Sequence, residues 1–192
     1  MRLTLLLMLL FIAACGGPSS VSEPSGVQPQ LVGAAREGRA TEIGGLVGLG
    51  ANPNGESGVN HWTVLMHAIH KNQFASVKAL LDLGADPNRR SSDQPSALMM
   101  AAGYGQLDVV RLLLERGADP YASYRGETAL DWAVGGTTDI DDFTLFRCQS
   151  GTVRAILLRA PDLATAAFRA RNRLKLAVCP DVRTAVSSRG KG

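Results

Sequence analysis

Few side chains in this 192-residue chain could do chemistry, and they are unevenly distributed. All three histidines, His61, His67 and His70, lie within ten positions of one another. His67 and His70 are three residues apart, which places them on one face of a helix. Imidazole is a common ligand of zinc and copper, but a metal site needs three or four converging ligands. The spacing leaves a metal site open, while an ordinary polar helix face explains it more simply.

Methionine and aspartate raise two further alternatives. Thioethers could add ligands for copper or haem, although methionine more often fills gaps in a core; the candidates are Met66, Met99 and Met100. The aspartates of residues 139–142 hint at calcium, but the segment lacks the glycine and distal glutamate of an EF-hand. The chain contains no phosphate-binding glycine loop, no nucleophile elbow and no HExxH pair. We therefore expect no catalytic residues, no cofactor and no enzymatic activity.

A repeat determines which elements would position these side chains. The segment TVLMHA at residues 63–68 is followed by VKALLDLGADPN at 77–88. SALMMA at 96–101 is followed by VRLLLERGADP at 110–120, so the second copy begins 33 residues after the first. A period of about 33 residues predicts a stack of small units, each too small to bury its own apolar face.

The sequence within each unit resembles an ankyrin repeat, whose pattern runs TPLHxA, a turn, a VVxLLL helix and then GADxN. The resemblance implies an all-α ankyrin repeat solenoid of helix-turn-helix units joined by extended finger loops. Thr63 and Ser96 are expected to cap the first helices, because a hydroxyl can accept from an unpaired backbone N–H. Gly84 and Gly117 are expected to end the second helices in a left-handed conformation.

Helical spacing also predicts which side chains are buried. The stripe expected to face the core in the first complete unit is Leu65, Ala68, Val77, Leu80 and Leu81. Met66 and Met99 occupy the usual histidine position of the ankyrin pattern and are expected to be packed.

The match extends in both directions to about four repeats, which we expect at residues 30–54, 55–88, 89–121 and 122–160. The first is recognised without its finger, and the last begins with a third helix opening, TALDWA, at residues 128–133. An insertion at about 137–148 interrupts the last repeat, before VRAILL at 153–158 completes its second helix. Four repeats exceed the ~3 units that usually suffice for stability.

In ankyrin proteins the fingers and the exposed face of each first helix grip a protein partner. The partner-binding residues that the resemblance implies here are His61, Trp62, His67, Arg89, Met100, Tyr104, Tyr124, Arg125 and Trp132. Tryptophan, tyrosine and arginine are the residue types that dominate binding energy at interfaces. Packing between repeats stays an equal alternative for Trp62 and Trp132, since aromatic side chains also anchor cores.

The amino terminus predicts export. Arg2 precedes an apolar run that ends at Ala14, which is the pattern of a signal peptide and too short to span a bilayer comfortably. Residues 12–15, IAAC, resemble the lipobox of bacterial lipoproteins, which implies cleavage before Cys15 and lipidation of its thiol. An ordinary secretory signal or an uncleaved anchor stays open. Residues 15–29, rich in Pro, Ser and Gly, are expected to form an extended tether.

If the chain is exported, its two remaining cysteines are expected to be oxidised. Cys148 and Cys179 are an even pair in an exported chain, which predicts a disulfide. Such a bond would close a loop of about 30 residues and stabilise the fold by roughly 3–4 kcal/mol on the chain-entropy model. Two unpaired thiols remain the alternative, because spacing cannot show whether the Cα atoms approach.

Charge separates the repeat body from the carboxyl terminus. Residues 15–168 carry twelve Lys/Arg and sixteen Asp/Glu, whereas residues 169–192 carry seven and one. We expect residues 161–192 to form a capping helix and a basic tail. The apolar side expected to close the stack is Leu163, Ala167, Ala170, Leu174 and Val178. The basic end could touch anionic head groups, although charge runs are more often solvated faces.

These observations predict a non-enzymatic, lipid-anchored protein of the bacterial envelope that binds a protein partner through its fingers and concave face. It would face the periplasm, with the outer membrane favoured over the inner membrane by Gly16 after the lipidated cysteine. We expect a monomer. Because the chain carries an export signal, we expect it to bind no nucleic acid. Three alternatives stay open: an immunity or inhibitor protein against an exported toxin or hydrolase, an envelope-stress protein that binds metal or haem through the His/Met face, and a structural scaffold with several weak partners.

Overall fold

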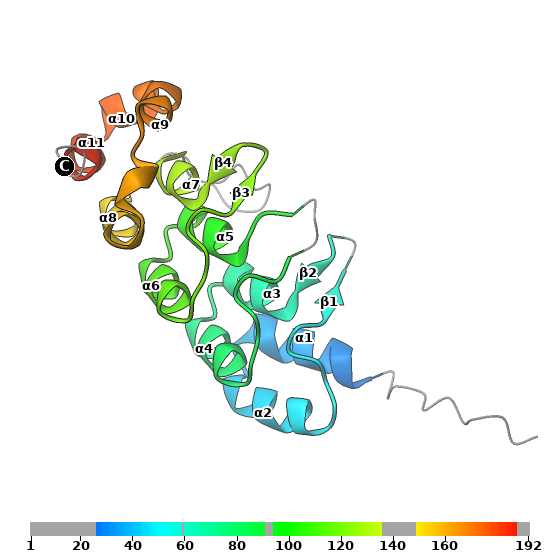
Figure 1. Ribbon diagram of the computed structural model, residues 1–192. Helices are drawn as coiled ribbons and strands as arrows, with labels where there is room; N and C mark the ends of the chain where they lie inside the picture. The colour runs from blue at the N-terminus through cyan, green and yellow to red at the C-terminus, as the bar shows by residue number, and fades with distance from the viewer. Residues whose placement is uncertain (1–25, 59, 91–93, 136–148, 188–192) are drawn as a thin grey trace, which may run out of the picture.

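A computed structural model describes residues 26–58, 60–90, 94–135 and 149–187, which form helix pairs stacked side by side (Figure 1). The predicted signal peptide, Cys15, Cys148, the insertion and most of the tether lie outside these residues. Within the described ranges, no helix combines the length and the apolar character needed to cross a membrane.

The paired helices are α1 (Val27–Glu37), α2 (Ala40–Gly48), α3 (Val64–His70), α4 (Phe74–Asp82), α5 (Ala97–Gly103), α6 (Leu107–Glu115), α7 (Ala129–Gly135) and α8 (Ser150–Arg159). Two short hairpins precede α3 and α7: β1 (Glu56–Ser57) with β2 (Trp62–Thr63), and β3 (Ser123–Tyr124) with β4 (Glu127–Thr128). The C-terminal end adds the 3₁₀ turn η1 (Pro161–Leu163), α9 (Ala166–Arg171), α10 (Arg173–Val178) and α11 (Pro180–Ser187). First helices line up along one side of the stack and second helices along the other (Figure 1).

The expected helix ends are confirmed. The hydroxyl oxygens of Thr63 and Ser96 each accept from a backbone N–H three residues on, at 3.2 Å in both cases. Gly84 and Gly117 both have φ of +86°, the left-handed conformation that ends a helix without strain at glycine. Because these interactions span only a few residues, the repeat sequence is enough to specify them.

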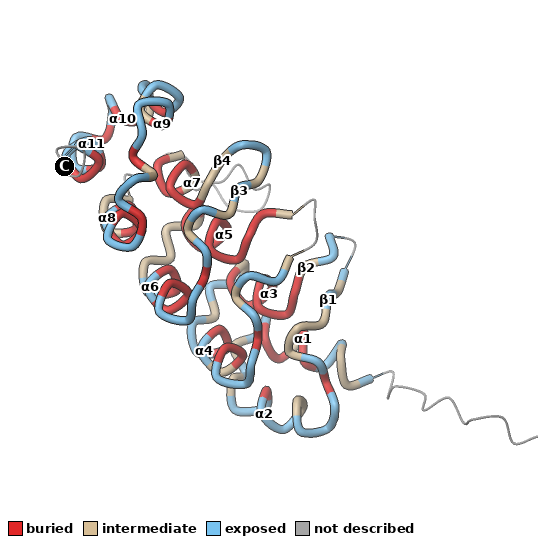
Figure 2. Tube along the Cα trace, in the orientation of Figure 1, coloured by how far each residue is buried: buried red, intermediate tan, exposed pale blue. Residues whose placement is uncertain are grey.

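The core runs between the two helix layers (Figure 2). The predicted stripe is buried throughout, and Met66 and Met99 are fully buried. The second helix predicted at 153–158 is present as α8, which buries Val153, Ile156 and Leu157. These apolar faces supply most of the stabilisation, at about 25 cal/mol per Å² removed from water.

Neutral amide side chains tie successive turns together. Asn54 donates to the carbonyl of Gly84 (3.0 Å) and accepts from the N–H of Asp86 (2.7 Å). One repeat later, Asn88 donates to the carbonyl of Gly117 (2.9 Å) and accepts from the N–H of Asp119 (2.8 Å). The same atoms of an asparagine thus satisfy one acceptor and one donor of the next turn.

This series of side-chain bonds between successive turns, the asparagine ladder, changes at both ends of the stack. At the start, Gln28 donates to the carbonyl of Asn52 (3.1 Å) and accepts from the N–H of the same residue (2.8 Å), so both bonds go to one residue. After Asn54 and Asn88, the third position of this kind is Tyr121, whose hydroxyl donates to Asp162 at 2.6 Å. The repeat that follows Tyr121 lacks the Gly-Ala-Asp turn, so a longer side chain bonds to a carboxylate instead.

Glutamines before the second helices form another inter-repeat series. Gln106 donates to the carbonyl of Ile69 (2.7 Å), and Gln149 donates to the carbonyl of Gly103 (3.1 Å). Gln149 lies 43 residues after Gln106, whereas Gln106 lies 33 residues after its equivalent Gln73. The repeat therefore resumes in register at Gln149, after the insertion.

The start of the first repeat differs from the expected tether. Helix α1 begins at Val27, so residues 27–29 are helical rather than extended. Pro29 lies in the first turn, where a proline is tolerated because the missing N–H has no partner within the helix.

The C-terminal end also differs from the single helix that we expected. Thr165 caps α9 by accepting from the N–H of Phe168 (3.0 Å), Asn172 separates α9 from α10, and Pro180 is the first residue of α11. Because the chain turns at these points, only Leu163 of the predicted apolar side packs against the core, whereas Leu174 is 83% exposed and Val178 is 70% exposed. The side chains that close the end are instead Phe168, Leu176, Val182, Ala185 and Val186.

One buried carboxylate joins this end to the repeats. Asp131 of α7 is 2% exposed, and its Oδ2 accepts from the N–H and the hydroxyl of Thr128, both at 2.9 Å. Its Oδ1 accepts from Arg171 Nε (2.9 Å) and Nη2 (2.8 Å) and from Asn172 Nδ2 (2.8 Å). Burial disfavours the charged form, but the hydrogen bonds from Thr128, Asn172 and Arg171 outweigh it, so the pKa of Asp131 lies below its ordinary value.

Candidate partner-binding surface

The first hairpin positions His61 and Trp62. Glu56 pairs with Thr63 and Ser57 with Trp62, and the turn between the strands includes Gly58 and His61 at positive φ. His61 is exposed in this turn, whereas Trp62 is half-buried against the first helix. The finger of this repeat therefore forms a hairpin although it is longer than the finger that follows.

The second hairpin positions Tyr124, Arg125 and Trp132. Arg125 and Gly126, both at positive φ, make the two-residue turn between β3 and β4, and this geometry matches the twist of the strands. The Arg125 guanidinium lies 5.1 Å from the centre of the Tyr124 ring, a cation–π arrangement. The Tyr124 ring meets the Trp132 ring edge to face at 6.5 Å, and Trp132 Nε1 donates to Glu127 (3.0 Å).

A row of aromatic rings crosses from one repeat to the next. The centres of the Trp62 and His70 rings are 5.1 Å apart, and those of His70 and Tyr104 are 5.8 Å apart. His70 Nδ1 lies 2.9 Å from the Tyr104 hydroxyl, so a hydrogen bond also links the two repeats. All three rings are half-buried, which leaves an amphipathic edge on the surface.

His67 is not on this surface, which corrects the expectation for that residue. It is 6% exposed, packs 5.6 Å from Trp62, and its Nε2 lies 3.2 Å from the carbonyl oxygen of Ser57. A carbonyl oxygen only accepts, so Nε2 carries the proton. Burial lowers the pKa of His67, and this outweighs the hydrogen bond to Ser57, which favours the charged form. His67 is therefore a neutral residue that supports the first hairpin.

Met100 is a second correction, because its side chain is 3% exposed and belongs to the core. All seven residues of α5 are buried, and the half-buried Tyr104 just beyond its end is the nearest side chain that reaches the surface. Arg89 is exposed and lies 3.9 Å from Glu56 of the neighbouring finger, a distance at which a surface ion pair contributes little. Of the nine predicted residues, seven thus remain at least partly exposed, and two are buried.

Sequence reasoning missed two residues of this surface, His70 and Glu127. His70 lies between Trp62 and Tyr104, and its position three residues after His67 was the available signal. Arg90 donates to the carbonyls of Gln94 (3.1 Å) and Ser123 (3.0 Å), which ties one finger to the next hairpin. Glu127 orients Trp132. Arg90 lies in a finger, where the repeat pattern places partner contacts. Glu127 has no such signal, because its role depends on Trp132 in another element.

The ligand-binding alternative finds no support in the described part of the chain. There, no three His, Cys, Asp or Glu side chains gather as a metal site requires. His67 Nε2 is engaged by Ser57, and His70 Nδ1 is engaged by Tyr104. The aspartates of 139–142 lie outside the described residues.

The lipidation and disulfide predictions stay predictions. Cys15 and Cys148 lie outside the described residues. Cys179 is buried between α10 and α11, where it is 4% exposed and packs with the C-terminal core.

Comparisons with known proteins place the repeats in a family. The family described as ankyrin repeats (3 copies) matches residues 31–124 and 84–143. A putative ankyrin repeat-containing protein of Treponema pallidum is 36% identical over 93 residues, which are 48% of this chain and 31% of that protein. A putative ankyrin repeat protein of Acanthamoeba polyphaga mimivirus is 37% identical over 84 residues, or 41% of this chain and 51% of that protein.

A shorter match is to a bacterial protein whose name does not mention ankyrin repeats. Protein PhlB of Serratia liquefaciens is 46% identical over 63 residues, which are 33% of this chain and 28% of that protein. This chain spans about half or less of the length of each of these relatives. The family match covers more than half of the chain and coincides with the helix pairs from α1 to α7. The chain therefore belongs to the ankyrin repeat family, and its all-α repeat solenoid is a protein–protein interaction module.

Proposed function

We propose that this protein is a non-enzymatic, lipid-anchored component of the bacterial envelope that binds a protein partner through its hairpins and the ends of its first helices. The observation that carries the binding surface is the aromatic row formed by Trp62, His70 and Tyr104 across two repeats. Half-buried aromatic rings lose little conformational freedom on binding and offer large contact areas, so they are suited to anchor a partner.

The second hairpin extends the same surface. Arg125 is held at its tip, stacked on Tyr124, and Trp132 is oriented by Glu127. Arginine and tryptophan in such fixed positions are typical energetic centres of an interface. The packing of both tryptophans within their repeats and their role in binding are compatible, because each is only half-buried.

The proposed location rests on the amino terminus. Cleavage before Cys15 and lipidation of its thiol would hold the repeats at a membrane facing the periplasm, with the outer membrane favoured. Replacement of Cys15 by serine should release the protein into the soluble fraction. Membrane fractions before and after this change measure the effect, and continued sedimentation of the variant with membranes would remove the anchor from the proposal.

Site-specific photo-crosslinking of the full chain in its native host tests the binding surface. A photoreactive amino acid at Arg125 or at Lys71, both exposed beside the aromatic clusters, should give one discrete adduct with a protein partner. The same amino acid at Lys78, exposed on the second-helix side, is the matched control. Equal adducts from Lys78, or none from Arg125 and Lys71, would contradict the surface.

The identity of the adduct also decides the immunity or inhibitor alternative. An exported toxin or hydrolase in that adduct would favour it, whereas a resident envelope protein would favour a general binding module. The metal or haem alternative has no observation in its favour among the described residues.

A further inference from the structure

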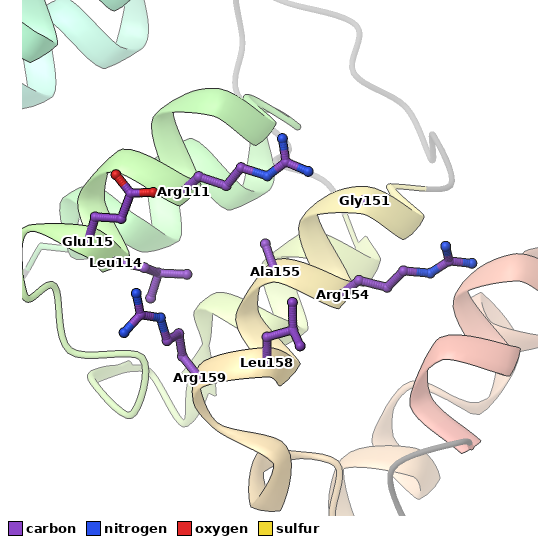
Figure 3. A pocket seen from close by; sticks show the side chains of 8 residues that line it. All are labelled: Arg111, Leu114, Glu115, Gly151, Arg154, Ala155, Leu158 and Arg159. Carbon is purple, nitrogen blue, oxygen red and sulfur yellow. The ribbon is translucent and has the colours of Figure 1, made fainter.

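The second-helix side of the stack contains a groove that the hairpin surface does not use. It lies between α6 and α8 and has a volume of about 370 Å³. Figure 3 shows Leu114 pointing from α6 toward α8, with Ala155 and Leu158 on the opposite side. Three guanidinium groups surround this apolar strip, those of Arg111, Arg154 and Arg159, together with one carboxylate, that of Glu115.

At the corresponding junction between α4 and α6, an ion pair links the two helices. Asp82 of α4 accepts from Lys78 of the same helix at 2.7 Å and from Arg116, which follows α6, also at 2.7 Å. One carboxylate thus neutralises a cation of its own repeat and a cation of the next.

The equivalent bonds are missing one repeat later. Glu115 stands 33 residues after Asp82, and Arg159 stands 43 residues after Arg116, across the insertion. Among the residues that the structure describes, neither Glu115 nor Arg159 forms an ion pair. Arg111 approaches Asp108 at 3.8 Å on the exposed surface, too far for a strong hydrogen bond.

The residue at position 158 also distinguishes the α6–α8 junction from the α4–α6 junction. In α4 and α6 the equivalent position is acidic, Asp82 and Glu115, whereas α8 carries Leu158 there, 63% exposed. Arg154 also makes no ion pair or hydrogen bond within the described residues. The groove therefore combines an exposed apolar side chain, Leu158, with two arginines, Arg154 and Arg159, that form no ion pair with any described residue. Packing of α6 against α8 does not require this combination.

We propose that the α6–α8 groove binds an acidic peptide segment of a protein partner, with an apolar side chain flanked by carboxylates. The apolar side chain packs on Leu158, Ala155 and Leu114, and the carboxylates bind the guanidinium groups of Arg154 and Arg159. Arginine presents a planar fork that binds a carboxylate through two parallel hydrogen bonds, which favours this ligand class over a simple counter-ion. The site is separate from the hairpin surface and does not depend on it.

Fluorescence anisotropy of the full chain, purified in a neutral detergent, tests the proposal. The probes are labelled peptides of one leucine flanked by two glutamates, with the spacing between the glutamates varied across the set. A matched set carries glutamine in place of glutamate. We expect at least one acidic spacing to bind, its glutamine counterpart to bind at least about tenfold more weakly, and added salt to weaken the complex.

Two variants locate the binding. The double variant Arg154→Gln and Arg159→Gln should weaken the acidic peptide at least about tenfold, because it removes both proposed contacts. The control Arg173→Gln and Arg183→Gln changes the net charge equally, at a different groove in the C-terminal end. Far-ultraviolet circular dichroism and the urea midpoint verify that both variants remain folded.

Each result decides the proposal. Binding that is lost with the Arg154 and Arg159 variant and kept with the control supports it. No preference for the acidic set over the glutamine set, or equal losses in both variants, overturns it. The Cys15→Ser variant, which lacks the proposed anchor, is tested in parallel with vesicles that contain or lack anionic lipid. Binding that requires anionic lipid, without binding of any acidic peptide, would overturn the proposal in favour of a lipid surface. Failure of the hairpin crosslinks, by contrast, leaves these results unaffected.

Discussion

The junctions in the middle of the stack and the junction at its C-terminal end use different chemistry. In the middle, Asn54 and Asn88 make the same pair of neutral hydrogen bonds to the next turn. At the end, the buried carboxylate of Asp131 binds Arg171 and Asn172. A periodic sequence lets one neutral bond be reused, whereas a non-repeating end needs its own contacts. The difference predicts that the asparagine bonds do not respond to pH, whereas the Asp131 junction does.

The largest expected effects come from the core that both regions share. Leu113 of α6 and Ile156 of α8 are equivalent, and both are fully buried. Replacement of either by alanine should cost about 2–5 kcal/mol in the free energy of unfolding, measured by urea denaturation. Hydrogen exchange should separate the regions: Leu113→Ala should accelerate exchange throughout the stack, and Ile156→Ala mainly in α8–α11. Identical exchange patterns would mean that the end is not a separate unit.

Asp131→Asn should have the next largest effect, about 1–3 kcal/mol at neutral pH, since it weakens charge-assisted bonds in a buried site while Arg171 keeps part of its hydration. The pKa of Asp131 is lowered in the folded state, so its contribution is present above the ordinary pKa of aspartate and is lost as pH falls through the lowered value. The wild type should therefore lose stability between about pH 4 and the acid limit, and Asp131→Asn should lose less.

The control for this pH dependence is Asp181→Asn, which removes an exposed carboxylate from α11 of the same end. Urea midpoints of all three proteins across the acid range measure the difference. A wild-type slope that Asp131→Asn retains unchanged would show that other carboxylates govern acid stability.

Asn88→Ala should cost about 1 kcal/mol, because two neutral hydrogen bonds at an exposed turn contribute near the low end of their range. The effect should be independent of pH, in contrast to that of Asp131→Asn. Asn60→Ala, an exposed asparagine of the first finger, is the matched control. If the two alanine variants have the same denaturation midpoint, the ladder does not hold the middle of the stack.

The smallest effect concerns the point where the ladder changes. The hydrogen bond from the Tyr121 hydroxyl to Asp162 raises the pKa of Tyr121, because ionisation would place two negative charges together. Asp162→Asn should lower the pKa of this tyrosine, seen as phenolate absorbance that appears at lower pH. The Tyr121→Phe variant identifies which part of the phenolate absorbance belongs to Tyr121. If the titration is unchanged in Asp162→Asn, the hydrogen bond between Tyr121 and Asp162 does not hold in solution.

The repeat fold was predictable because its determinants are local and recur. Thr63 and Ser96 cap helices through bonds that span three residues, and Gly84 and Gly117 end helices through their own backbone freedom. The C-terminal end was not predictable in the same way. A single periodic helix accounted for Leu174 and Val178, but Asn172 and Pro180 divide the chain into short helices that turn other residues inward.

The binding surface was predicted in part for the same reason. Hairpin positions such as Tyr124 and Arg125 follow from their place in the repeat. The burial of His67 and Met100 depends on neighbours in other elements, which a family pattern does not name. The contact of His70 with Tyr104 joins residues 34 positions apart, and no local rule links them.

The amino-acid sequence determined the period, the helix pairs, the caps and the apolar stripe, since each depends on interactions within one repeat or between identical neighbours. Tertiary structure alone decided which aromatic rings meet, where the lowered pKa of Asp131 arises, and which guanidinium groups line the α6–α8 groove. The physical reason is distance along the chain. Contacts between unlike elements depend on how whole helices pack, and short-range pattern carries little of that information.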